Sequence, residues 1–126
     1  MSQVIAIGTN AAKVEGHEIY PIKQAIINAT TLGDNQIVEA VTGKKIRVLN
    51  RWYRSSGSVI LTWKSGTGIG STIISASDTL LQGYGVSDNW APCGWFFETK
   101  VGEALNASLS GNVSVTGELN YIEVGV

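Results

Sequence analysis

Two side chains suited to nucleophilic or metal chemistry occur only once each, which limits what the chain can assemble from them. His17 is the one histidine and Cys93 the one cysteine. A zinc site takes several nitrogen or sulfur ligands, so these two residues cannot build a histidine- or cysteine-based one, and no disulfide can form within the chain. Nucleophilic catalysis by a thiol needs a base beside it, and a Cys93–His17 pair is the one such combination that the sequence allows.

Glu98 and Glu103 are the other catalytic candidates, because a glycosidase works with two carboxyl groups that flank the bond it cleaves. They lie on either side of a turn expected after the aromatic run 95–97. Two carboxylates in such a place more often form a solvated end or a hydrogen-bonded corner. We therefore expect a protein that is not an enzyme, with no catalytic residue, no metal and no cofactor.

A basic segment, residues 44–54, is a candidate binding surface. Its cations, with the rings of Trp52 and Tyr53 among them, could bind nucleic acid by charge and stacking. However, nine basic and ten acidic residues give the whole chain a net charge of −1, which argues against a nucleic-acid surface. Strict alternation places Arg47 and Arg51 on one strand face with Leu49 and Tyr53, which suits a protein–protein contact. A solvated outer face is the alternative. The segment's cations and rings are Lys44, Lys45, Arg47, Arg51, Trp52, Tyr53 and Arg54.

Aromatic residues also gather in and beside the irregular segment 83–94, namely Tyr84, Trp90 and Trp95 around Pro92. Rings in loops at the end of a sandwich stack on sugars in carbohydrate-binding modules. They equally close the end of a core or line a subunit interface, because they bury a large area. We expect core or interface for Trp90 and Trp95, with sugar stacking as the alternative.

The elements that must position these residues are strands. The chain has 13 Ile and 12 Val against 8 Leu, together with 15 Gly, a composition typical of strands separated by turns. Residues 44–54 and 58–65 alternate apolar and polar side chains around Ser55-Ser56-Gly57, which predicts a hairpin. Residues 8–18 are weakly patterned and predict a loop. Further strands are expected within 19–29, 36–41, 71–82, 94–99, 103–110 and 113–126.

Turn signals spaced about eight to twelve residues apart predict an all-β protein, an antiparallel jelly-roll-like β-sandwich with about eight main strands. An immunoglobulin-like sandwich is the alternative, although the chain lacks the cysteine pair of antibody domains. We expect residues 1–17 to form an N-terminal arm or edge strand and residues 18–126 to form one domain. No apolar run is long enough to span a membrane, and the first residues lack the pattern of a secretory signal.

Three segments carry a resemblance to a known group of proteins. They are VTGKKIRVL at 41–49, GWFFETKVGEALN at 94–106 and VTGELNYIEV at 115–124, with an SGxV turn at 56–59. In this order they resemble small β-folded virion proteins of tailed bacteriophages and prophages, which look like capsid decoration or cement proteins. The resemblance covers residues 35–126, and its motifs are structural rather than catalytic.

The resemblance implies a decoration protein that binds the outside of the capsid and bridges neighbouring copies of the major capsid protein. It would be synthesised in the cytoplasm of the host bacterium and reside on the virion surface, contacting neither nucleic acid nor membrane. The last strand carries Leu119 and Tyr121 on one face and Ile122 and Val124 on the other, which suggests a further interface in a homo-dimer or homo-trimer. The alternative is a tail or head fibre or spike component that binds a host glycan through the loop aromatics.

The residues expected to contact the partner combine the basic segment, two tryptophans and the start of the chain. They are Val4, Ile5, Ile7, Lys44, Lys45, Arg47, Arg51, Tyr53, Arg54, Trp90 and Trp95.

Overall fold

A computed structural model describes residues 3–7, 10–15, 18–89 and 94–125, and its regular structure is β-strand apart from one turn of 3₁₀ helix, η1 (Gly68–Gly70). The all-β expectation is therefore confirmed. One antiparallel sheet has the order β10-β6-β13-β4, and β11 pairs with β6. We call it the β6 sheet; its strands are β4 (Lys23–Ala29), β6 (Lys44–Ser55), β10 (Gly85–Asn89), β11 (Phe97–Glu98) and β13 (Val115–Gly125).

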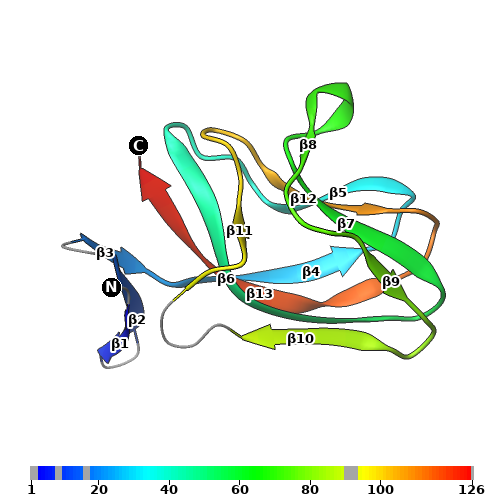
Figure 1. Cartoon of the computed structure of the whole chain (residues 1–126), viewed down its shortest axis with the longest axis horizontal. Helices are drawn as coiled ribbons and strands as arrows, with labels where there is room; N and C mark the ends of the chain where they lie inside the picture. Colours follow the sequence, from blue (N-terminus) through cyan, green and yellow to red (C-terminus); the bar gives the residue numbers. More distant parts are fainter. Residues whose placement is uncertain (1–2, 8–9, 16–17, 90–93, 126) are drawn as a thin grey trace.

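A second antiparallel sheet has the order β5-β12-β7-β8, and β9 also pairs with β7. We call it the β7 sheet; its strands are β5 (Gly33–Val38), β7 (Val59–Ser65), β8 (Thr72–Ile73), β9 (Asp78–Leu80) and β12 (Leu105–Leu109). In Figure 1 strands of the two sheets lie across one another, with the chain passing repeatedly from one sheet to the other.

The core lies between these sheets and is formed by alternate residues of their strands. Trp63 of β7 is fully buried, and its ring lies 6.0 Å from that of Tyr53 in β6 and 5.6 Å from that of Phe97 in β11, between ring centroids. Aliphatic residues of both sheets complete the same cluster, including Ile27 of β4 and Leu105 of β12. This shared core makes the molecule β-sandwich-like.

The N-terminal residues form a sheet of their own. Strands β1 (Gln3–Ile7), β2 (Asn10–Glu15) and β3 (Glu18–Pro21) pair in that order, antiparallel. Only Ile22 separates β3 from β4, and β3 also contacts β13, so this N-terminal sheet extends from one end of the sandwich (Figure 1). The predicted loop over 8–18 is wrong for residues 10–15, and the pairing of β2 with β3 carries the N-terminal unit past residue 17 to Pro21.

A β-bulge in β6 changes which of its side chains face the core. Along β13, Asn120 pairs with Asn50 but Tyr121 pairs with Val48, which leaves one extra residue in β6. A bulge reverses the alternation beyond it. Ile46 and Val48 therefore face the core before the bulge, whereas Arg51, Tyr53 and Ser55 face it afterwards. The strict alternation expected from the sequence is wrong beyond Leu49.

The predicted hairpin between residues 44–54 and 58–65 is also wrong, although both strands exist. β6 and β7 belong to different sheets, and the residues between them cross from one sheet to the other. The backbone groups that a hairpin would pair find distant partners: Ser55 N–H donates to Tyr84 O (3.0 Å) and Ser56 N–H donates to Ser114 O (2.9 Å). Each strand buries its apolar face against the other strand instead of lying beside it.

Candidate binding surface

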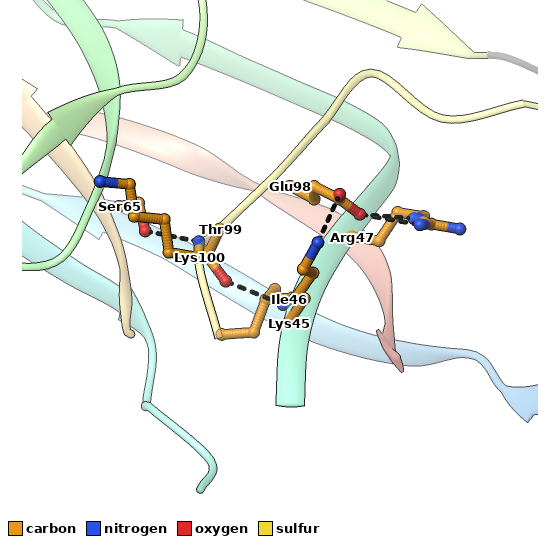
Figure 2. A network of polar contacts seen from close by, with 7 residues as sticks. All are labelled: Lys45, Ile46, Arg47, Ser65, Glu98, Thr99 and Lys100. Atoms are coloured by element: carbon orange, nitrogen blue, oxygen red, sulfur yellow. Dashed lines mark hydrogen bonds and ion pairs between the residues drawn. The ribbon is translucent and has the colours of Figure 1, made fainter. Parts of the chain in front are cut away.

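Part of the predicted contact set comes together on the outer face of the β6 sheet. Glu98 of β11 lies opposite Arg47 of β6 in the register. Its carboxylate accepts hydrogen bonds from Arg47 Nε (2.9 Å) and Lys45 Nζ (3.3 Å), and Figure 2 shows Glu98 between these two cations. These hydrogen bonds fix the orientation of both cations.

Trp95 adds an aromatic surface to this group. The guanidinium of Arg47 lies over its ring, 4.6 Å from the centroid, in a cation–π contact, and the residue remains 40% exposed. We call Lys45, Arg47, Trp95 and Glu98 the basic–aromatic cluster. Its two cations and one anion give a net charge of +1. It therefore combines a partly exposed ring with positive groups that are held in place.

The other predicted contact residues lie elsewhere. Lys44 is half-buried at the start of β6, and Arg54 is exposed near the opposite end of the same strand. Trp90 lies outside the described residues. Val4, Ile5 and Ile7 belong to β1, where Ile5 pairs with Ala12 of β2; the structure describes their backbone register.

Arg51 and Tyr53 are inside the sandwich, because the bulge turns them inward, and they are not part of the outer surface. The hydroxyl of Tyr53 donates a hydrogen bond to the carboxylate of Asp78 in β9, and Arg51 Nη2 lies 4.0 Å from the same carboxylate. Burial, together with the hydrogen bond to Asp78, raises the pKa of Tyr53 well above its ordinary value. The arginine also lies over Phe97, 5.3 Å from its ring centroid. These residues link the two sheets through the interior.

Ile122 lies on the face of β13 for which the sequence suggested an interface with another subunit. It is fully buried within the single chain, although it lies outside the main core cluster. Its burial therefore does not require another subunit. The apolar character of both faces of β13 is not by itself an indication of an oligomer.

Sequence reasoning missed a second group on the same outer face. Trp52 and Glu118 are cross-strand neighbours, and Trp52 Nε1–H donates a hydrogen bond to Glu118 Oε1 (3.0 Å). Gln24, Asn50 and Asn120 lie beside them on β4, β6 and β13. Strict alternation placed Trp52 on the face of Ile46 and Val48, so only recognition of the bulge could have moved it outward.

Glu98 and Glu103 each have a structural partner. Glu98 pairs with the two cations of the cluster, whereas Glu103 Oε1 accepts a hydrogen bond from Ser65 Oγ (2.7 Å). Ser65 Oγ in turn accepts one from Lys100 N–H (2.8 Å), and Thr99 Oγ1 accepts one from Ile46 N–H (2.9 Å), as Figure 2 shows. These bonds attach the segment after β11 to both sheets.

Metal and membrane features can be assessed for the described part of the chain. Its residues contain no group of three or more His, Cys, Asp or Glu side chains placed to hold a metal ion. No helix among them is long and apolar enough to cross a membrane. His17 and Cys93 lie outside the described residues.

The chain was compared with models of protein families, with curated proteins and with solved structures, and none of the three comparisons finds a match.

Proposed function

We propose that this chain is a non-enzymatic structural protein of a bacteriophage virion, a decoration protein that binds the outside of the capsid and bridges neighbouring major capsid proteins. The resemblance of segments 41–49, 94–106 and 115–124 to small virion proteins supports the proposal. These segments contribute to β6, β11 and β13, and both β11 and β13 pair with β6. The resemblance therefore falls on strands that adjoin one another and form the framework of one sheet.

The strand order supports a jelly roll. Strands β8 and β9 both pair with β7, and β10 and β11 both pair with β6, so each couple is counted as one interrupted strand. In chain order, the β6 sheet then holds the first, eighth, third and sixth strands, and the β7 sheet holds the second, seventh, fourth and fifth. This order supports the proposal of a jelly roll, an architecture common in viral capsid proteins.

The N-terminal sheet is the observation that carries the docking role. A short sheet of three strands needs an apolar face or a packed neighbour to be stable. The register aligns Ile5, Ala12 and Pro21 across the three strands, and Val14 and Ile19 belong to the same face. Ile19 is 62% exposed. An exposed apolar side chain at this end of the sandwich fits a contact with a capsid subunit, with the basic–aromatic cluster as a second contact.

The proposed mechanism is preferential binding to the mature shell. A bridging interface of ordinary size buries about 1,600 Å² in total. If the site exists only where expanded subunits meet, each bound copy lowers the free energy of the expanded lattice and leaves the unexpanded one unchanged. A homo-dimer or homo-trimer would match a local symmetry axis of such a lattice.

The experiment mixes the purified chain with expanded, emptied capsids of the phage that encodes it and measures bound mass by mass photometry. We expect binding at a fixed number of copies per capsid subunit. Removal of residues 1–17 should abolish it, and Trp95→Ala should weaken it by about tenfold, the effect of losing one buried anchor ring. Trp52→Ala is the matched control, since it removes an equally exposed ring from a different part of the sheet. A chain that stays free at saturating capsid concentration would refute the decoration role.

A further inference from the structure

Trp52 is an exposed ring held in a fixed orientation on the outer face of the β6 sheet. It is 43% exposed although it lies in β6, which has a neighbouring strand on both sides. Its indole N–H donates to Glu118 Oε1 (3.0 Å), and Gln24 Nε2 donates to the other oxygen of the same carboxylate. The ring therefore presents a surface whose orientation is fixed by hydrogen bonds rather than by burial.

Side-chain amides continue this polar surface along the sheet. Asn50 and Asn120 form the next cross-strand pair, and Asn120 Nδ2 donates to Asn50 Oδ1 (2.8 Å). That bond leaves the amide nitrogen of Asn50 and the amide oxygen of Asn120 for other partners. Both residues are half-buried. The surface thus combines a ring with donors and acceptors that are already positioned.

A hollow of about 330 Å³ opens beside the ring, lined by Trp52, Tyr53, Arg54, Gly83, Gly85, Val86 and Ser87. Small residues of β10 create it. Ser87 lies directly opposite Trp52, and Gly85 lies opposite Arg54. A Cβ at Gly85 would collide with the carbonyl oxygen of Tyr53, so this position accepts no side chain that could close the space.

The chemistry of this surface selects among ligands. Nucleic acid needs several cations, and among the described residues that line the hollow Arg54 is the one cation, near the Glu118 carboxylate. A protein interface places apolar groups at its centre, whereas this surface has a carboxylate between Trp52 and the exposed Ile26 of β4 and a row of amides beside it. A neutral sugar has an apolar ring face for stacking and hydroxyl groups that pair with carboxylate and amide groups.

We propose that this face binds a neutral oligosaccharide. One pyranose stacks on Trp52 above the hollow, and its hydroxyls donate to Glu118 and exchange hydrogen bonds with Asn50 and Asn120. The site differs from the loop aromatics suggested by the sequence, and it is separate from the basic–aromatic cluster. The proposal does not depend on the decoration role, because it uses other residues.

The test uses the full chain labelled with ¹⁵N and follows the indole N–H signal of Trp52, assigned with Trp52→Phe. A glycan array of neutral bacterial and plant oligosaccharides first selects a probe, with maltohexaose, cellohexaose and chitohexaose titrated directly to about 5 mM, enough to detect millimolar dissociation constants. We expect at least one probe to shift this signal. Trp52→Ala, followed through the backbone amide signals of Glu118 and Asn120, should weaken binding by about tenfold or more, and Ser87→Arg, which fills the hollow, should weaken it as well.

Trp95→Ala is the matched control for sugar binding and should leave it unchanged, the reverse of its expected effect on capsid binding. Silence across the array and the three hexasaccharides, with a folded protein, overturns the proposal. So does binding that persists in both Trp52→Ala and Ser87→Arg. Concentration-dependent self-association of the chain that Trp52→Ala abolishes, without sugar binding, would identify the face as a contact between protein chains and also overturn the proposal.

Discussion

Replacing Tyr53 with phenylalanine removes the hydroxyl that links β6 to Asp78 of the opposite sheet. Tyr53 is 1% exposed, and its ring remains against Trp63 in the variant, so the packing is retained. A hydrogen bond to a charged group contributes about 1.5–3 kcal/mol to stability. We therefore expect Tyr53→Phe to lower the free energy of unfolding at pH 7 by about that amount.

The pH dependence of this difference is a sharper test than its size. Burial, together with the hydrogen bond to Asp78, raises the pKa of Tyr53, so the folded chain keeps the phenolic proton at a pH where the unfolded chain has lost it. The contribution to stability is complete below the unfolded value, near 10, and is lost as the pH rises toward the folded value. Above about pH 10, wild-type stability should fall more steeply than that of Tyr53→Phe, by up to ~1.4 kcal/mol per pH unit.

Urea unfolding followed by tryptophan emission, between pH 7 and about pH 11.5, measures both quantities. The two proteins should differ most at neutral pH and converge above about pH 10. Burial also raises the pKa of Tyr121, but that residue is common to both proteins and cancels in the comparison. Tyr84→Phe, which changes a phenol 66% exposed, should leave the free energy at pH 7 unchanged. Parallel profiles for wild type and Tyr53→Phe would refute the inferred link to Asp78.

Two further substitutions test the close approach of strands and the attachment of the segment after β11. Gly117→Ala should prevent folding or lower the melting temperature severely, because a Cβ there would collide with the carbonyl oxygen of Trp52. Gly111→Ala is the control, because a Cβ at Gly111 would enter open space. Equal melting temperatures for the two variants would contradict this account. Thr99→Val should cost about 1–3 kcal/mol in chemical unfolding, since it leaves the buried N–H of Ile46 without its acceptor; an unchanged midpoint would show that the bond does not matter.

The sequence predicted which residues form strands better than it predicted which strands pair with one another. Alternation in residues 58–65 correctly indicates that Val59, Leu61 and Trp63 share a buried face. The alternation does not indicate whether the strand at residues 44–54 pairs with this strand in one sheet or packs across the core from it. Both arrangements bury the same residues. The hairpin expected at residues 55–57 failed for this reason. The β10 strand was missed because Gly85–Asn89 contains a single apolar residue.

The bulge in β6 explains the main error in the candidate site. The residues around Leu49 and Asn50 carry no glycine or proline to mark an interruption, so strict alternation was the natural expectation. One inserted residue was enough to exchange the two faces beyond it, bringing Arg51 and Tyr53 inward and Trp52 outward. Lys45, Arg47 and Glu98 precede or lie beside the bulge, and their grouping depends on a register that the sequence pattern alone does not contain.

The central position of β13 has a consequence for the order of folding. β13 is the last strand of the chain, yet it lies between β6 and β4, strands formed from much earlier residues. Because β13 follows both strands in the sequence, β4 and β6 are synthesised well before it, and until β13 joins them the β6 sheet cannot close and its core side remains open. This pairing of strands far apart in the sequence favours slow folding and exposes unpaired strand edges to other chains in the meantime.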